Sequence, residues 1–206
     1  MIDDIDEIHQ LGLQQTSKVF LTNTTELNDI KLSSPVRCVI TSPPYPNRYS
    51  YVWNTRPHLY LFDFLSTAKQ ASDIDKDTIS GTWGSATSIL GKGKIEAEFP
   101  IVSESVGHIV ESIRQEDNLM ANYAMKYFNL LAKQILEMDK LLAKDARIAY
   151  VVGCSRLKGV YIETDLILGK IIEGLRLGYE VTTIERIRRR NSGKDLHESI
   201  VYAWKK

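Results

Sequence analysis

The stretch VITSPPYPNRYSYVW, residues 39–53, joins an apolar segment to two adjacent prolines and a group of aromatic residues. The residues at 36–40, VRCVI, are mostly β-branched or apolar and predict a strand. The two prolines remove two backbone donors and fix φ twice, so the strand has to end there. The loop that follows is therefore stiff, with a hydroxyl at Ser42 and an aromatic ring at Tyr45.

An isolated pair of prolines is most often only the exit from a strand, so the rest of the chain has to decide its meaning. The chain has 206 residues, enough for one domain with a sizeable core. It is 43% hydrophobic and 25% charged, with 26 basic and 26 acidic residues. This balance points to no nucleic-acid or membrane partner, and only a local concentration of charge would do so.

The two cysteines, Cys38 and Cys154, lie far apart, without Cys-x-x-Cys spacing and with no histidine near them in the sequence. They predict reduced intracellular thiols, neither a disulfide nor a metal site, and the histidines are interpreted as structural. No apolar run reaches the roughly 18 residues that cross a bilayer, and the start MIDDIDEIHQ is acidic, unlike a signal sequence. We therefore expect a cytoplasmic protein without membrane contact or bound metal.

Hydrophobic periodicity predicts alternating strands and helices. Strands are expected at 19–21, 36–40, 147–152, 179–188 and 199–204, and helices at 59–65, 119–142 and 166–177. The segment 147–152 is mostly apolar, which predicts burial on both faces. Thr164 or Asp165 is expected to cap the helix that follows. The last two strands are joined by a short turn and predict an antiparallel hairpin.

Residues 69–118 contain several glycines and scattered charges with little period, and they predict a loop-rich insertion that is mobile until a partner binds. Around this insertion, strands alternate with helices before the final hairpin. This order predicts a single α/β domain over residues 1–206, with a mostly parallel sheet that ends in an antiparallel hairpin.

Such a sheet resembles the methyltransferase variant of the Rossmann-like fold, where ligands lie at the carboxyl ends of strands. The sequence TSPPY at 41–45 stands at such an end and resembles the catalytic motif of DNA amino-methyltransferases. PNRYSY after the motif, GTWGSAT at 81–87 and the segment 186–205 are similar to parts of the same superfamily. The resemblance extends from about residue 18 to the end.

The resemblance implies S-adenosylmethionine-dependent methylation of an exocyclic amino group in double-stranded DNA, as in restriction-modification systems. The serine-first motif implies cytosine N4 as the target, and adenine N6 remains an alternative. The amino group is a poor nucleophile because its lone pair is delocalised into the ring. Ser42 Oγ and the Pro43 carbonyl would accept its hydrogens, while Pro44 keeps the loop rigid. Tyr45 offers a face on which a flipped base can stack.

Two further groups of residues are predicted to contact DNA. Arg48, Tyr49 and Tyr51 follow the motif, with plain loop packing as an equal alternative. A concentration of positive charge around the last hairpin turn predicts phosphate contact. It comprises Arg186, Arg188, Arg189, Arg190 and Lys194, and Asn191 would add a hydrogen bond.

One part of the family pattern is missing. Complete members carry a glycine-rich loop whose backbone wraps the amino-acid end of the cofactor, and this sequence lacks it. Asn23, which stands where the family usually has an acid, and Thr41 are the expected cofactor contacts.

The strand that precedes the missing loop would lie beside 36–40, so its loss leaves an apolar edge exposed. We therefore expect a partial Rossmann-like methyltransferase domain, the catalytic half. It would be completed in a heterodimer by a polypeptide with the glycine-rich loop, or by the rest of a longer parent. The alternative is a non-catalytic DNA-binding or scaffold subunit.

Overall fold

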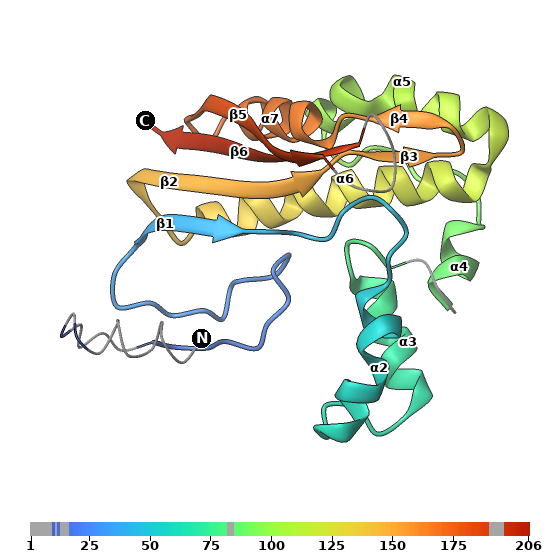
Figure 1. Cartoon of the computed structure of the whole chain (residues 1–206), viewed down its shortest axis with the longest axis horizontal. Coiled ribbons are helices and arrows are strands. Elements are labelled where there is room, and N and C mark those ends of the chain that lie inside the picture. The colour runs from blue at the N-terminus through green and yellow to red at the C-terminus, as the bar shows by residue number, and fades with distance from the viewer. Residues whose placement is uncertain (1–9, 11, 13–16, 82–84, 190–195) are drawn as a thin grey trace.

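A four-stranded sheet runs through the molecule, with its strands in the spatial order β1-β2-β6-β5 (Figure 1). The computed structural model describes residues 10, 12, 17–81, 85–189 and 196–206. The sheet strands are β1 (Val36–Thr41), β2 (Leu142–Gly153), β5 (Tyr179–Arg189) and β6 (His197–Lys205). Two short strands, β3 (Ser155–Leu157) and β4 (Val160–Ile162), form a separate hairpin.

The sheet is mixed, which corrects the expectation of a mostly parallel one. Among the described strands only β1 and β2 run parallel, in a register that pairs Cys38 with Arg147 and Thr41 with Tyr150. The C-terminal hairpin of β5 and β6 is antiparallel, as predicted, and β6 also pairs antiparallel with β2. Because β6 is inserted directly beside β2, antiparallel pairings outnumber the parallel one. The α/β class is confirmed.

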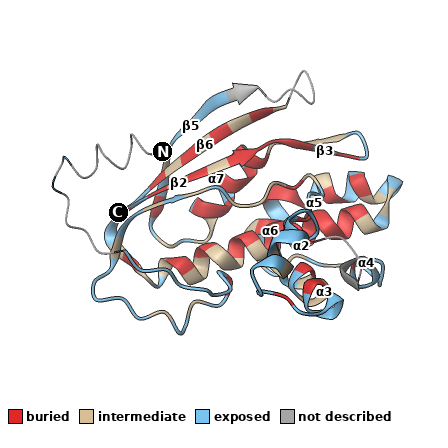
Figure 2. Ribbon diagram, turned by 60° about the horizontal axis from the view of Figure 1, so that its bottom comes forward, coloured by how far each residue is buried: buried red, intermediate tan, exposed pale blue. Residues whose placement is uncertain are grey.

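The helices form one layer and a projecting arm. They are α2 (Tyr51–Leu61), α3 (Ala68–Asp77), α4 (Ser85–Leu90), α5 (Pro100–Glu116), α6 (Asn118–Asp139) and α7 (Thr164–Gly174). Helices α5, α6 and α7 lie on one face of the sheet, and α2 and α3 extend away from it (Figures 1 and 2). In the part of the chain that the structure describes, no helix combines the length and apolar character that crossing a membrane requires.

Helix α6 is the centre of the core. Its apolar residues recur at helical spacing, and the side chains of Tyr123, Tyr127, Leu131 and Ile135 are completely buried. Asp117 caps the helix by accepting a hydrogen bond from the backbone N–H of Met120 at 3.1 Å. The predicted helix at 119–142 is therefore confirmed, with its end three residues earlier.

The region 69–118 contains more regular structure than the loop-rich insertion that was expected. Helix α5 lies within it, and its buried residues Val102, Val106, Val110 and Ile113 follow helical spacing in the main core. Serines, charges and Gly107 between these positions hide the period in the sequence. The connecting segment 91–99 is fastened to α6 by the buried amides of Asn122 and Asn129.

Burial of β2 alternates, so the prediction of a strand buried on both faces was wrong. Ile148, Tyr150 and Val152 are buried, whereas the side chains between them are only half-buried. The Tyr150 hydroxyl donates to Gln134 of α6, so the buried set faces the helical layer. On β6, Trp204 remains 43% exposed. The described residues thus cover one face of the sheet and leave the other partly open.

Two predicted elements of the N-terminal half differ from the structure. Residues 19–21 form no strand, and Val19 and Leu21 are 96% and 95% exposed. The helix expected at 59–65 begins earlier, at Tyr51, and ends at Leu61, which is 75% exposed. In the described part of the chain, the exposed apolar side chains of these segments are not covered by other side chains. Apolar composition alone therefore gave a wrong prediction for both.

The start of α7 also differs from the prediction. Its N-cap is Glu163, without a side-chain hydrogen bond, and Thr164 and Asp165 lie inside the first turn. Both are buried. The Asp165 carboxylate does accept the neighbouring Leu166 N–H at 2.9 Å, but it also accepts hydrogen bonds from Ser199 and Cys154 across the core. Tertiary contacts therefore decide its position.

We expect Asn122→Ala to lower the free energy of unfolding by about 2 kcal/mol, because it leaves buried backbone groups without partners. The Asn122 amide donates to the carbonyls of Leu90 and Gly93 and accepts from the N–H of Ile95. The control is Asn118→Ala, which removes an exposed amide that also bonds Gly93. It should cost less than about 0.5 kcal/mol. Urea unfolding measures both, and equal losses would contradict the role given to Asn122.

Candidate active site

The SPPY loop leaves the sheet at the carboxyl end of β1. Thr41 is the last residue that pairs with β2, and the prolines that follow cannot donate to a ladder. Ser42 is exposed, while Pro43, Pro44 and Tyr45 are half-buried. The motif therefore presents a hydroxyl at the rim of the sheet on a rigid backbone.

Two buried tyrosines of α6 hold the loop at its two ends. The Tyr127 hydroxyl donates to the Pro44 carbonyl at 2.8 Å, and the Tyr123 hydroxyl accepts from the Arg48 N–H at 3.1 Å. Burial raises the pKa of Tyr123 to about 12 and that of Tyr127 well above its ordinary value. Both phenols are therefore neutral at physiological pH and act as fixed hydrogen-bonding groups.

A third contact joins the loop to the opposite part of the sheet. The Tyr45 hydroxyl donates to Glu198 Oε1 at 3.2 Å. Glu198 is the second residue of β6, and across the hairpin its backbone is paired with Arg188 of β5. This register brings Arg188, at the end of β5, and the SPPY loop to the same end of the sheet.

One of the two predicted cofactor contacts, Asn23, lines a cleft beside the SPPY loop. A cavity of about 380 Å³ is lined by Thr22–Thr25, Pro44 and residues 77–79 at the end of α3, among others. Asn23 therefore reaches the catalytic motif in space, and Thr41 lies three residues before Pro44. However, Asn23 Oδ1 already accepts hydrogen bonds from the N–H and hydroxyl of Thr25, at 3.0 and 2.9 Å. The turn at residues 22–25 therefore lines the cavity but does not surround a ligand with backbone donors.

The aromatic residues after the motif form an exposed cluster at the base of the arm. Tyr49 and Tyr51 pack edge to face, with ring centroids 5.0 Å apart, and are 47% and 44% exposed. Arg48 is exposed and adopts φ of 61°, a conformation that turns the chain into α2. Between the tyrosines, the buried Ser50 caps α2 and donates to Asp75 at 2.5 Å. The arm is thus tied to the loop.

The predicted phosphate-binding group is placed in part. Arg186 is exposed on β5, and Arg188 and Arg189 belong to the last residues of that strand. Arg190, Asn191 and Lys194 lie outside the described residues.

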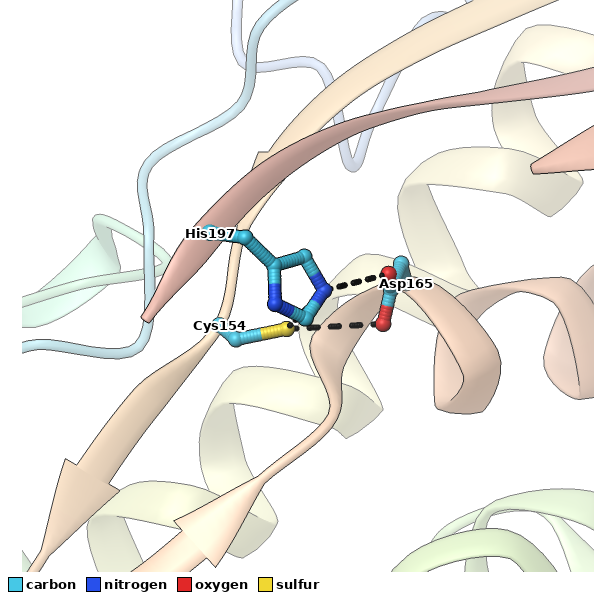
Figure 3. Close-up of side chains that lie close together, drawn as sticks. All are labelled: Cys154, Asp165 and His197. Atoms are coloured by element: carbon cyan, nitrogen blue, oxygen red, sulfur yellow. Dashed lines mark hydrogen bonds and ion pairs between the residues drawn. The ribbon is translucent and has the colours of Figure 1, made fainter. Parts of the chain in front are cut away.

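Sequence reasoning missed the residues that hold the motif in place, namely Tyr123, Tyr127 and Glu198. Tyrosines at apolar positions of a core helix were a usable signal, because a buried hydroxyl needs a partner. The sequence also gave no indication that Cys154 and His197 lie together. The structure corrects this, since their Sγ and Nε2 atoms lie 3.3 Å apart, beside Asp165 (Figure 3).

The chain is similar to two curated relatives, both described as Type II methyltransferase M.AvaI, from Nostoc sp. and Anabaena variabilis. Each is 26% identical over 188 residues, covering 82% of this chain and 38% of the relative. The chain therefore spans well under half the length of these relatives. No family profile and no solved structure matches it. The similarity supports a relationship with DNA methyltransferases, as the motif predicted.

We expect Tyr123→Phe to increase hydrogen exchange at the Arg48 amide, because this substitution removes the acceptor of its hydrogen bond. Tyr150→Phe is the matched control, since it removes another buried hydroxyl, bonded to Gln134 of α6 at 2.7 Å. The control should lower global stability by about 1 kcal/mol without selective deprotection of Arg48. Equal exchange at Arg48 in wild type and Tyr123→Phe would show that Tyr123 does not anchor the loop.

Proposed function

We propose that this chain is the catalytic half of an S-adenosylmethionine-dependent DNA methyltransferase that modifies an exocyclic amino group, with cytosine N4 as the target. The SPPY loop carries this proposal. It lies at the carboxyl end of a parallel strand, and two buried tyrosines of α6 bond its Pro44 carbonyl and the Arg48 N–H that follows it. The 26% identity with Type II methyltransferases supports the reaction class.

Positioning is the chemistry that the loop can perform. The exposed Ser42 hydroxyl and the Pro43 carbonyl accept the two hydrogens of the target amino group, which draws electron density onto its nitrogen. The Tyr127 hydroxyl donates a hydrogen bond to the neighbouring Pro44 carbonyl. The backbone that presents these acceptors is therefore fixed before a base binds. Tyr45 provides a ring for stacking, and its bond to Glu198 sets the orientation of that ring.

The residues present build only part of a cofactor site. When bound, the cofactor supplies the methyl group that is transferred. Asn23 contributes to the cavity wall beside Pro44, and Thr41 lies three residues before Pro44, but the sequence contains no glycine-rich loop to hold the amino-acid end. The remainder of the site has to come from elsewhere, either from a second polypeptide or from the rest of a longer chain.

The edge of the sheet provides the place for that complement. β1 pairs with β2 on one side, and Ile40, close to its end, is 78% exposed. An apolar edge strand with unpaired backbone groups is an aggregation hazard that native proteins cover. We propose that a parallel strand of the cofactor-binding half pairs with β1, and that helices of that half cover the open face of the sheet.

Double-stranded DNA is the proposed substrate. Arg48 and the pair of Tyr49 and Tyr51 follow the SPPY loop and are proposed to contact the DNA, together with the basic residues around the last hairpin turn. Arg186, Arg188 and Arg189 lie on the strand that ends at this turn, and Arg190, Asn191 and Lys194 continue it in the sequence. Positive charge near the flipped base neutralises phosphates without reading sequence.

In the completed enzyme, Ser42→Ala should lower methyl transfer about 100-fold, because one acceptor of the amino hydrogens is lost. Tyr45→Ala should lower it about 10- to 100-fold, whereas Tyr45→Phe keeps the stacking face and should lose much less. Nucleoside digestion and mass spectrometry of the DNA measure both rate and product. Full activity of Ser42→Ala would contradict the catalytic role of Ser42. If N6-methyladenine is the product, the target base is adenine and the assignment of cytosine N4 is wrong.

The 206-residue chain should bind S-adenosylmethionine weakly or not at all, because no backbone cradle holds the carboxylate end. Adding a polypeptide that carries the glycine-rich loop should restore binding and transfer. Calorimetry measures the affinity, with S-adenosylhomocysteine as the reference ligand and Ile40→Lys as a variant that charges the β1 edge. Micromolar affinity of the monomeric chain for S-adenosylmethionine would refute the proposal that its cofactor site is incomplete. If the added polypeptide restores activity to Ile40→Lys as well as to wild type, that polypeptide does not bind at the β1 edge.

A further inference from the structure

Three buried side chains from distant parts of the chain lie close together (Figure 3). Cys154 directly follows β2, Asp165 lies in the first turn of α7, and His197 begins β6. They are 1%, 1% and 6% exposed. The segments are 11 and 32 residues apart in sequence, so only the fold brings a thiol, a carboxylate and an imidazole together.

One possible ligand atom from each of these residues lies within 4.8 Å of the other two. Cys154 Sγ lies 3.3 Å from His197 Nε2 and 3.4 Å from Asp165 Oδ1, and His197 Nε2 lies 3.0 Å from Asp165 Oδ2. Donors bound to one tetrahedral zinc ion at about 2.0–2.3 Å lie about 3.3–3.6 Å from one another. The separations of His197 Nε2 from Cys154 Sγ and from Asp165 Oδ2 are close to this range, and the contact of Sγ with Oδ1 places the same carboxylate beside the thiol.

The same geometry does not fit a nucleophilic triad. In such a triad the imidazole turns one nitrogen to the nucleophile and the other to the acid. Here a single nitrogen, Nε2, faces both Cys154 and Asp165. Burial raises the pKa of the Cys154 thiol to about 11, so without a metal it stays protonated, and no substrate reaches it.

Outer contacts orient the donors as metal sites require. The Tyr161 hydroxyl lies 3.3 Å from His197 Nδ1, the second nitrogen of the ring, and also forms a hydrogen bond with the Cys154 thiol, so it holds both side chains in place. The Ser199 hydroxyl donates to Asp165 Oδ2 at 2.7 Å. Burial alone would raise the pKa of Asp165, but the hydrogen bonds from Ser199 and His197 lower it. The carboxylate is therefore already ionised.

We propose that Cys154, Asp165 and His197 bind one zinc-type divalent ion that fixes the start of β6. The ion replaces the thiol proton, which goes to solvent, and the neutral imidazole binds through Nε2. Three protein donors leave the fourth tetrahedral position to a small oxygen ligand. The next residue, Glu198, holds Tyr45, so the ion stabilises the strand end that orients the motif. The ion takes no part in methyl transfer itself.

Cobalt is the probe, because a thiolate bound to Co²⁺ gives a charge-transfer band that oxygen and nitrogen ligands do not. The 206-residue chain is stripped with a chelator and titrated with Co²⁺, then with Zn²⁺ in competition. Cys154→Ser is the test variant and Cys38→Ser, at the exposed cysteine of β1, is the matched control. The serine hydroxyl can still donate to Asp165, so a purely hydrogen-bonded cluster should tolerate the test variant.

Wild type and Cys38→Ser should bind one ion per chain, show the band and unfold at higher temperature with Zn²⁺. Cys154→Ser should lose the band and bind more than about 100-fold more weakly, since loss of an outer contact alone lowers affinity about 10- to 100-fold. The measurements on the wild-type chain test the proposal by themselves, even if Cys154→Ser does not fold. A chain with native circular dichroism that takes up no ion, or whose cobalt complex lacks the band, overturns the proposal.

Discussion

The hydrogen bond from the buried Tyr127 hydroxyl to the Pro44 carbonyl is the contact on which the site depends. A loop with two prolines has few backbone donors, so its orientation must be fixed through carbonyls. Helix α6 supplies that partner from the middle of the core, where leaving a phenol unpaired would cost about 1–3 kcal/mol. The packing that builds the core therefore also sets the position of Ser42 and Tyr45.

The second constraint is the incomplete cover of the sheet. Helices α5, α6 and α7 lie on one face, and the alternating burial of β2 shows that its other face has no equivalent layer in the described residues. Together with the exposed edge at β1, this supports the proposal that the chain is one half of a layered domain. The same open edge stands beside the motif. Completion of the fold and completion of a cofactor site would thus be one event.

Local patterns predicted the parts of this structure that depend on local interactions. The strand that ends at the prolines, the long helix α6 and the antiparallel hairpin of β5 and β6 all follow from periodicity and turn residues. The expected strand at 19–21 did not form, because a strand needs a neighbour and apolar composition cannot supply one. The burial of β2 was misjudged for a related reason, since an apolar run does not say how many layers cover it.

Contacts between distant segments lay beyond sequence reasoning. Cys154 and His197 are separated by 43 residues, and their meeting depends on the register that pairs Gly153 with Glu198. Side chains along a strand alternate between its faces, so His197 and Ser199 turn toward Asp165 while Glu198 turns toward Tyr45. A shift of one residue at the start of β6 would exchange these roles and break both groups of contacts. The register of this one strand therefore couples the buried cluster to the loop, and any ligand that stabilises the cluster also stabilises the orientation of Tyr45.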